Sequence, residues 1–466
     1  MVFASMIAFG SLAGAAAPEM APVKIQDRLP DTAGLLPPSR VRLDGYLGGR
    51  VARNATNRLL NVDENVLLGG FRKRSGSQEW IGEHVGKFLH AATLAWVYTG
   101  DARLREKIDR VAAELIKCQE PDGYLGTYLA KDRWTSWDVW VHKYDLVGLL
   151  TYYQYTGNQP ALEASRKIGD LLTGTFGPGK RSLIAAGTHV GMAATSVLEP
   201  MVLLYRCTGD EKYLEFCKYI VRSYDQEGGP KIITTLKNVG RVDKTANGKA
   251  YEMLSNLVGL CELAAVTGDG SYLTPAINAW EDVVANHLYI TGSASQGEHF
   301  RTPHDLPNTA KANVAETCVT TTWIQLNLAL LRLTGEARYG DELERTFYNH
   351  LAAAQRPDGA QWCYFTPLEG KKDYGPGTSC CVSSGPRGMA LVPQAAYIKY
   401  KAGEKDGLAV NLFENSTCTV ELDGKTVYTM PWEYTDDGGH LNELGRRVVA
   451  REFLRTLASV RGKPLR

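Results

Sequence analysis

The sequence predicts a mainly α-helical protein, an (α/α)6 toroid followed by a shorter, apparently truncated β-sandwich region. Five repeats of a helical-hairpin pattern, long polar and aromatic linkers between them, and short alternating segments after about residue 395 support this prediction. At 466 residues the chain exceeds what one hydrophobic core usually organises. We expect a signal peptide over 1–18, the helical barrel over 19–395, and a partial β-sandwich with an irregular tail over 396–466.

The composition excludes several classes of protein. Hydrophobic residues make up 44% of the chain and charged residues 22%, which are ordinary globular values and argue against disorder or a coiled coil. The 52 Lys and Arg residues nearly balance the 51 Asp and Glu residues, giving a net charge of +1. This balance argues against nucleic acid or an anionic membrane as the main partner.

The first twenty residues, MVFASMIAFGSLAGAAAPEM, form an apolar run with small residues near its end. Such a run is typical of a secretory signal, although it lacks a Lys/Arg-rich start, and a buried N-terminal helix is the alternative. Later in the chain no apolar run is long enough to span a membrane. We therefore expect a secreted or periplasmic protein that does not bind membranes.

The hairpin repeat consists of an apolar helix ending in Thr-Gly, a polar residue, and then an amphipathic helix, as in LVGLLTYYQYTGNQPALEASRKI. Glycine can adopt the left-handed conformation that ends the first helix, and the following Asp or Asn can cap the second. The five glycines lie about 50 to 70 residues apart, at Gly100, Gly157, Gly209, Gly268 and Gly335. A sixth pair before or between them would complete a closed ring, and an open solenoid is the alternative.

The linkers favour the ring. Segments such as WTSWDVWVHK and GSASQGEHFRTPHDLPNTAK are long and rich in aromatic and polar residues, as expected of loops around the mouth of a barrel. After about residue 395, AYIKYKA, LAVNLFE and TCTVELD alternate and are separated by Gly and Asp turns, which indicates strands. The final segment, from HLNELGRR onward, instead indicates a basic helix.

Two segments carry candidate metal ligands. VAETCVT provides Glu316 and Cys318, and TSCCVSSGPRG provides Cys380 and Cys381. In extended backbone an E-x-C pair places its carboxylate and sulfur on the same side, and the Cys pair adds two more sulfurs, enough for a closed tetrahedral zinc site. A Cys380–Cys381 vicinal disulfide, or simply buried cysteines, would explain the same residues.

The chain resembles glycoside hydrolase family 127, the β-L-arabinofuranosidases, over roughly residues 40–400. The resemblance rests on several segments in order, among them WIGEHVGKFLHA, GSASQGEHF, AETCVTTTWIQLNLALLRLTGE and CYFTPLEG followed by TSCCVSSGPRG. It implies a Zn²⁺ site formed by Glu316, Cys318, Cys380 and Cys381, with Cys380 as nucleophile. It also implies Glu298 as general acid/base, and His299 or Glu316 are the alternatives for that role.

Further residues are candidates for sugar binding. Trp80, Glu83 and His84 share a helix face if WIGEHVGK is helical, and a Trp, Glu and His face suits a hydroxylated ring. An inter-helix packing face is the alternative. The family places a substrate histidine at the position of His142, which could equally be a helix-start histidine.

The chain also departs from the family. Two further sugar-site histidines of the family have no obvious counterparts here, and the corresponding segments carry Glu199, and Glu252 with Asn256, while His189 lies nearby but out of register. Sites that recognise hydroxyls discriminate steeply, so we expect another L-sugar or an acidic pectic sugar as an alternative substrate.

The sequence therefore predicts a zinc-dependent retaining glycoside hydrolase. It would cleave terminal β-L-arabinofuranosyl or a related plant cell-wall or pectic sugar through a cysteine nucleophile, and its partner would be an oligosaccharide or glycoside. A non-catalytic sugar-binding or scaffold protein with a structural zinc site is the alternative. An epimerase or lyase is a third hypothesis, but it leaves the Cys pair without a role. The oligomeric state is left open.

Overall fold

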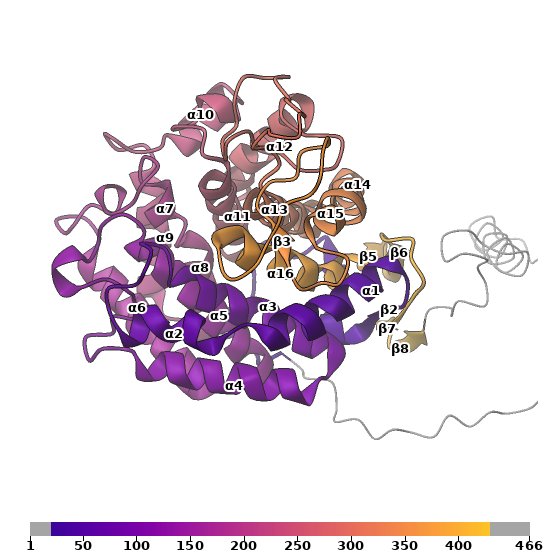
Figure 1. The fold of residues 1–466 in the computed structure, drawn as a ribbon, viewed down its shortest axis with the longest axis horizontal. Helices are drawn as coiled ribbons and strands as arrows, with labels where there is room; N and C mark the ends of the chain where they lie inside the picture. The colour runs from indigo at the N-terminus through magenta and orange to yellow at the C-terminus, as the bar shows by residue number, and fades with distance from the viewer. Residues whose placement is uncertain (1–19, 429–466) are drawn as a thin grey trace, which may run out of the picture.

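The computed structural model describes residues 20–428, and the expected signal peptide and C-terminal tail lie outside this range. Six inner helices form a closed ring in which each packs on the next (Figure 1). The last of them packs against both its predecessor and the first, so the barrel closes. The inner helices are α3 (Glu83–Thr99), α5 (Asp138–Thr156), α8 (Leu198–Thr208), α11 (Ala250–Thr267), α13 (Thr317–Thr334) and α16 (Cys380–Leu391).

Five outer helices follow their inner partners in sequence, as the hairpin pattern predicts. They are α4 (Ala102–Lys117), α6 (Gln159–Thr175), α9 (Glu211–Ser223), α12 (Leu273–Asn286) and α14 (Ala337–Thr346). The glycine after each of the first five inner helices has φ between 68° and 76° and ends its helix, and Asp101, Asn158 and Asp210 cap α4, α6 and α9. The predicted (α/α)6 toroid is confirmed.

The sixth pair lies elsewhere than predicted. Its inner helix, α16, comes after the five hairpins, and its outer partner α1 (Tyr46–Arg53) comes before them. The expectation of a sixth pair before or between the others was therefore right for its outer helix and wrong for its inner helix. The α16 sequence, CCVSSGPRGMAL, lacks the Thr-Gly ending and has Pro386 inside the helix, so the repeat pattern could not reveal it.

Helices α3 and α5 cross at close range because of a glycine. A Cβ atom on Gly86 would lie 1.9 Å from the carbonyl oxygen of Tyr144, so no other residue fits there without moving the two helices apart. Shorter helices occupy the connections, namely α2 (Glu64–Arg72), α7 (Met192–Thr195), α10 (Ile232–Asn238) and α15 (Ala352–Ala354). No helix between residues 20 and 428 is long and apolar enough to cross a membrane.

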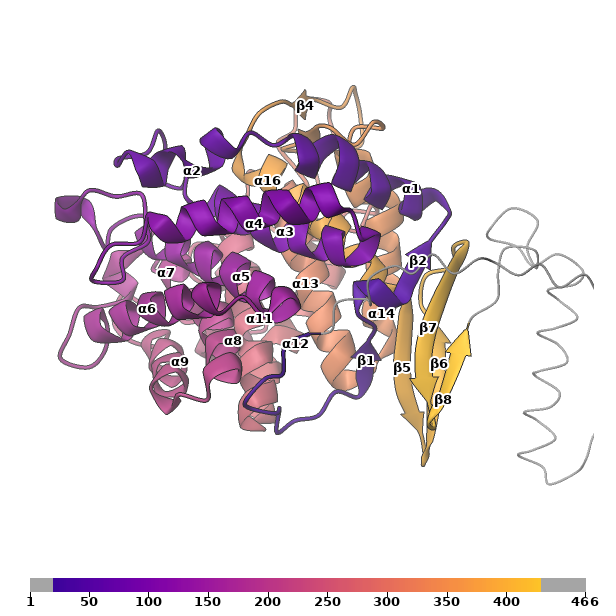
Figure 2. The ribbon, with the colours of Figure 1, turned by 90° about the horizontal axis from the view of Figure 1, so that it is seen from below.

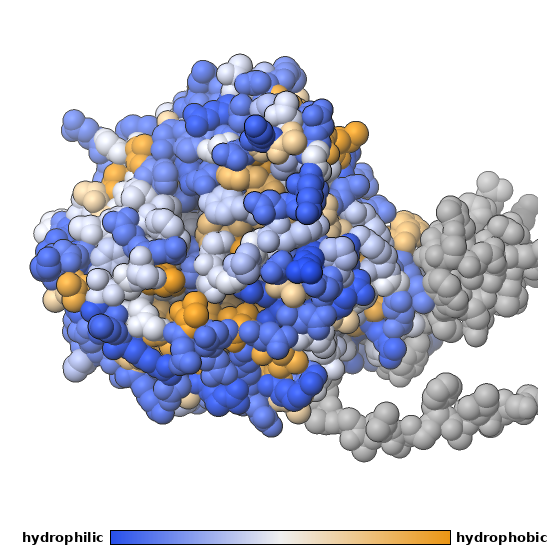
Figure 3. Space-filling view, in the orientation of Figure 1, coloured by the Kyte–Doolittle hydropathy of each residue, from blue (hydrophilic) through white to orange (hydrophobic). Residues whose placement is uncertain are grey.

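The predicted strands after residue 395 form two antiparallel three-stranded sheets beside the barrel (Figure 2). Each sheet takes one strand from the N-terminal region, which the sequence did not indicate. The orders are β1-β5-β6 and β2-β7-β8, with β1 (Ala33–Leu35), β2 (Val41–Leu43), β5 (Tyr397–Ala402), β6 (Lys405–Val410), β7 (Ser416–Leu422) and β8 (Lys425–Tyr428). A two-stranded sheet, β3 (Trp362–Cys363) with β4 (Tyr374–Gly375), lies near the start of α16. Most of the face seen in Figure 3 is hydrophilic, with smaller hydrophobic patches.

The N-terminal segment 20–32 crosses the end of the barrel where the inner helices finish. Its backbone N–H groups donate hydrogen bonds to carbonyls in the last turns of α5, α8, α11 and α13, in chain order. The pairs are Ala21 to Gln154 at 2.6 Å, Lys24 to Arg206 at 2.8 Å, Arg28 to Ala265 at 2.9 Å and Thr32 to Arg332 at 2.9 Å. This segment therefore pairs carbonyl groups that helix ends otherwise leave open.

Candidate active site

Two inner helices bring the four predicted metal ligands together at their N-terminal ends. Glu316 is the N-cap residue of α13 and Cys318 lies in its first turn, while Cys380 and Cys381 are the first two residues of α16. The expectation that Glu316 and Cys318 lie together in extended backbone was wrong for Cys318, which is helical. Glu316 alone is extended, and the helix start turns both side chains toward α16.

The ligand atoms of Glu316, Cys318, Cys380 and Cys381 all lie within 4.8 Å of one another. Cys381 Sγ is 3.3 Å from Cys318 Sγ, 3.6 Å from Glu316 Oε1 and 4.0 Å from Cys380 Sγ. Cys380 and Cys381 are both free thiols, so the alternative of a Cys380–Cys381 disulfide is not present. The geometry is that of a compact set of three sulfurs and one carboxylate.

Burial and hydrogen bonding shift the pKa values of these four residues in opposite directions. Burial raises the pKa of Glu316, Cys318 and Cys381 well above their ordinary values. Hydrogen bonds from Cys318 and Cys381, together with the Lys87 ammonium, hold the pKa of Cys380 well below that of an ordinary thiol. Its place at the start of α16 favours the thiolate further, because a helix N-terminus carries partial positive charge.

Cys380 is the one sulfur of the set that lines a cavity of about 240 Å³. Both polar and aromatic side chains line the cavity. Its wall consists of Trp80, Glu83, Trp137, Trp140, His189, Lys249, Tyr251, Glu252, Glu298, His299, Glu316, Tyr364 and Cys380.

Tyr364 bridges Glu298 and Cys380 in the wall of this cavity. The Tyr364 hydroxyl donates to Glu298 Oε1 at 2.6 Å and lies 3.3 Å from Cys380 Sγ. Glu298 is a loop residue with a left-handed backbone conformation, with φ of 67°. Its Oε2 accepts a hydrogen bond from Lys249 Nζ at 2.5 Å. Tyr364 was not among the predicted site residues, although it lies in the CYFTPLEG segment that carries the family resemblance.

The protonation of Glu298 depends on these neighbours. Burial alone would raise its pKa, but the Lys249 ammonium and hydrogen bonds from Lys249 and Tyr364 lower the pKa below the ordinary value. Glu298 is therefore a carboxylate at neutral pH in this arrangement. His299, the alternative acid/base, also lines the cavity, and its Nδ1 contacts the carbonyl oxygen of Gly297 at 2.6 Å.

Three tryptophans line the cavity and contact one another. The Trp80 and Trp137 rings meet edge to face at 6.2 Å, and Trp137 and Trp140 do so at 5.5 Å. Trp140 Nε1 donates to Glu83, whose Oε1 pairs with Lys87 Nζ at 2.8 Å. An apolar ring face beside fixed polar groups is the usual environment of a bound sugar.

Comparison with known proteins identifies the family. The model of the β-L-arabinofuranosidase GH127 catalytic domain matches residues 45–394, about three quarters of the chain. The chain belongs to the GH127 family. This match covers the cavity and all four residues of the Cys/Glu set.

Relatives of this GH127 chain include the non-reducing end β-L-arabinofuranosidase of Bifidobacterium longum, which is 26% identical over 366 residues. That alignment covers 71% of this chain and 54% of the relative, so the chain spans about half of its length. A solved GH127 β-arabinofuranosidase has a TM-score of 0.71 at 24% identity, covering 88% of this chain and 69% of the other. The GH127 β-L-arabinofuranosidase of Geobacillus stearothermophilus T6 has a TM-score of 0.69 at 22% identity, covering 85% and 71%. At these identities the structures show a shared fold.

Of the four predicted sugar-binding residues of the GH127 chain, two line the cavity and two do not. Trp80 and Glu83 line the cavity, but Trp80 precedes α3, so the predicted common helix face does not exist. His84 does not line the cavity and lies 3.0 Å from Ser383 Oγ through its Nδ1. His142 lies outside the cavity too, with its Nδ1 2.8 Å from the carbonyl oxygen of Asp138 and its ring against Tyr124.

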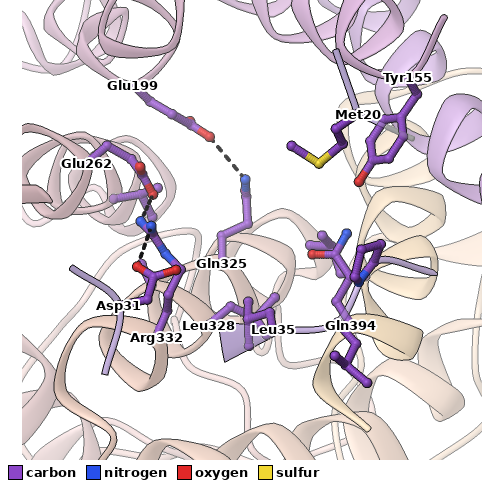
Figure 4. A pocket seen from close by; sticks show the side chains of 15 residues that line it. Met20, Asp31, Leu35, Tyr155, Glu199, Glu262, Gln325, Leu328, Arg332 and Gln394 are labelled. Carbon is purple, nitrogen blue, oxygen red and sulfur yellow. Dashed lines mark hydrogen bonds and ion pairs between the residues drawn. The ribbon is translucent and has the colours of Figure 1, made fainter. Parts of the chain in front are cut away.

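The residues that depart from the family pattern also differ in whether they line the cavity. Glu252 and His189 line the cavity, whereas Glu199 and Asn256 do not. Asn256 is buried and donates to the carbonyl oxygens of Met192 and Glu252, a packing role. Glu199 accepts a hydrogen bond from Gln325 at 3.3 Å in a second cavity of about 320 Å³ at the other end of the barrel (Figure 4).

A second group of potential ligands, Asp243, Asp282 and His287, lies away from the cavity. The guanidinium of Arg241 pairs with Asp243 at 2.6 Å and with Asp282 at 3.5 Å. Asp282 also accepts hydrogen bonds from Asn286 and from the backbone N–H of Val242. These carboxylates already have a cation, so we assign no metal to them.

Proposed function

We propose that this chain is a zinc-dependent retaining glycoside hydrolase that cleaves terminal β-L-arabinofuranosyl units, or a related plant cell-wall or pectic sugar, with Cys380 as nucleophile. One observation carries the proposal. Cys380 alone among the clustered sulfurs lines the cavity, and Tyr364 connects it to the Glu298 carboxylate. A nucleophile and an acid/base group on one sugar-sized cavity are the two parts that a retaining glycosidase requires.

The relatives support the substrate class. The Bifidobacterium longum protein is a non-reducing end β-L-arabinofuranosidase, and its alignment with this chain covers 71% of it. A cavity of about 240 Å³ suits one sugar unit better than a longer chain of them. Removal of a terminal unit agrees with a cavity of that size.

The four clustered residues fit zinc. Zn–S bonds of about 2.3 Å in a tetrahedron place sulfurs roughly 3.8 Å apart, and the sulfur pairs of Cys381 lie at 3.3 and 4.0 Å. Glu316 Oε2 is buried and lacks a hydrogen-bond partner within the described residues, as expected of a metal ligand. Glu316, Cys318, Cys380 and Cys381 would hold the ion, and bound zinc would keep the sulfurs deprotonated.

In the first half of the reaction, Cys380 Sγ attacks the anomeric carbon and a C–S bond forms. The bond to the leaving oxygen breaks, and Glu298 donates its proton to that oxygen. Glu298 must therefore hold a proton when the sugar binds, and a sugar ring that covers it raises its pKa by removing water.

In the second half, the Glu298 carboxylate removes a proton from water, and the water oxygen attacks the anomeric carbon. The C–S bond breaks and Cys380 leaves as a thiolate. Two displacements at one carbon retain its configuration. Lys249 and Tyr364 keep Glu298 beside the reacting atoms throughout.

The first prediction concerns turnover. The parent protein, purified with zinc under reducing conditions, is expected to hydrolyse 4-nitrophenyl β-L-arabinofuranoside or a related aryl glycoside. Cys380→Ala is expected to remove turnover by at least about 10³-fold, because no other group replaces the nucleophile. Cys118→Ser is the control, since Cys118 follows the outer helix α4, lies outside the cavity, and its thiol donates to the Glu114 carbonyl oxygen at 3.3 Å.

Release of nitrophenol and the melting temperature of each variant provide the measurement. Undiminished activity in folded Cys380→Ala would contradict the mechanism. Sugar binding by the parent with no turnover of any glycoside would instead favour the non-catalytic sugar-binding role.

A further inference from the structure

Glu252 lines the cavity, and one of its two carboxylate oxygens has no hydrogen-bond partner among the described residues. It occupies the first turn of α11, is only 1% exposed, and lines the same wall as Glu298. Its Oε2 is buried and has no hydrogen-bond partner among residues 20–428, and its Oε1 lies 4.0 Å from Lys249 Nζ. A buried acceptor without a donor costs free energy, so a carboxylate in this position needs a partner that the protein does not supply.

The charges around Glu252 restrict what that partner can be. Four carboxylates line the cavity, those of Glu83, Glu252, Glu298 and Glu316. Glu83 is paired with Lys87 at 2.8 Å, and Lys249, the one lysine in the wall, is paired with Glu298 at 2.5 Å.

The two histidines in the wall add no charge at neutral pH. Burial lowers the pKa of His189 to about 4 and also lowers the pKa of His299. The residues that line the cavity therefore offer no unpaired cation to an anionic sugar.

We infer that Glu252 is a specificity-determining residue, whose unpartnered oxygen accepts a hydrogen bond from one hydroxyl of a neutral sugar held in this cavity. The inference rests on the proposed function, since it places the sugar beside Cys380 and Glu298. It narrows the substrate class by excluding the uronic acids of pectin. A burial-raised pKa of about 7 leaves Glu252 partly ionised near neutral pH, and the carboxylate form is the stronger acceptor.

The test measures binding and does not depend on turnover. Tryptophan fluorescence reports occupancy, because Trp80, Trp137 and Trp140 line the cavity. The zinc-loaded parent, Glu252→Ala and Glu252→Gln would each be titrated with L-arabinose, with its 2-, 3- and 5-deoxy analogues, and with galactose and galacturonic acid. Glu199→Gln is the matched control, since Glu199 lies in the barrel interior but outside this cavity.

In the parent, loss of one particular hydroxyl is expected to weaken binding about tenfold or more, the usual effect of a hydrogen bond to a charged group. Glu252→Ala should bind that deoxy sugar and L-arabinose equally, while the other hydroxyls keep their effects. In Glu252→Gln the loss of affinity for that deoxy sugar should lie between the losses in the parent and in Glu252→Ala. This variant also keeps the test valid if Glu252→Ala does not fold. Galacturonic acid should bind at least about tenfold more weakly than galactose.

Three results would overturn the inference. Removal of each hydroxyl could weaken binding equally in the parent and in Glu252→Ala, galacturonic acid could bind more tightly than galactose, or no neutral sugar could bind. A shifted pH profile of turnover without a change in sugar selectivity would do so too, since Glu252 would then act only through Lys249. Sugar binding with the expected coupling but no hydrolysis would leave the inference standing and refute the proposed function.

Discussion

At the scale of single residues, Lys249 organises the charges in the cavity. Burial alone would lower its pKa, but the carboxylates of Glu252, Glu316 and Glu298 raise it, so Lys249 stays an ammonium. Its contact with Glu298 at 2.5 Å is in turn what lowers the pKa of that carboxyl. Lys249 therefore sets the pH at which Glu298 can act as an acid.

The second prediction follows from this pair. Lys249→Met removes the positive charge, so the pKa of Glu298 rises and the group keeps its proton to higher pH. The alkaline limb of the kcat/KM profile should therefore move to higher pH. Lys249→Arg keeps the charge and serves as the control. A limb that stays in place in folded Lys249→Met would mean that Glu298 is not the acid.

At the scale of helices, the site depends on two N-termini that meet. α13 supplies Glu316 and Cys318, and α16 supplies Cys380 and Cys381. These helices are neighbours in the ring, and α16 also closes it against α3. A metal shared by these four residues would therefore connect the last inner helix to the one before it.

The third prediction is that zinc stabilises this junction. The parent should contain about one zinc per chain, and removal by a chelator should lower the melting temperature and abolish turnover. Cys318→Ser is expected to lose the zinc, because one of the three sulfurs is gone. Cys363→Ser, at a buried thiol outside the set, should keep it. Elemental mass spectrometry and thermal melts check this, and a zinc-free parent with full activity would refute it.

The helices also show what a sequence can and cannot predict. Five hairpins were predictable, because a left-handed glycine after an apolar helix is a local requirement. Helix α16 was not, since its place in the ring depends on contacts with α13 and α3, far away in the chain. The four clustered residues followed from the family resemblance, not from spacing alone.

Side-chain direction was harder to predict than position. Glu83 and His84 are adjacent at the start of α3, yet one faces the cavity and the other faces Ser383. The start of the helix decides which way each points, and helix starts are poorly defined by sequence. Tyr364, although it lies in the CYFTPLEG segment, and Lys249 were not predicted, because nothing in the local sequence marks either as a partner of Glu298 and only the fold brings them to it.

At the scale of the whole molecule, the N-terminal segment and an ion-pair network hold the far end of the barrel together. Glu262 pairs with Arg206 at 2.5 Å and with Arg332 at 2.8 Å, and both arginines also contact Asp27 (Figure 4 shows Glu262 and Arg332). Three inner helices, α8, α11 and α13, are thereby joined to residues 20–32.

The fourth prediction concerns this network. Burial alone would raise the pKa of Glu262, but the two arginines lower it to about 2 from an ordinary 4.5. Its contribution to stability is therefore complete above about pH 4.5 and is lost as pH falls toward about 2. Glu262→Gln should destabilise the fold by about 3 kcal/mol at pH 7, because it leaves two arginines short of a partner.

Denaturant unfolding of the parent and Glu262→Gln between pH 7 and pH 2 checks this. The difference in unfolding free energy should shrink as pH falls. Glu106→Gln, at an exposed position on α4, should match the parent throughout. A difference that stays constant down to pH 2 would show that the substitution acts through packing and not through charge.

The fifth prediction is that the sugar becomes covalently bound to Cys380 during turnover. Glu298→Gln lacks the base of the second half-reaction, while a nitrophenyl leaving group departs without an acid, so the glycosyl-enzyme should accumulate. After incubation with 4-nitrophenyl β-L-arabinofuranoside, peptide mass spectrometry should find one pentosyl unit on Cys380 and none on Cys318 or Cys381. A burst of nitrophenol with the sugar attached to a carboxylate, or with no attached sugar, would contradict a cysteine nucleophile.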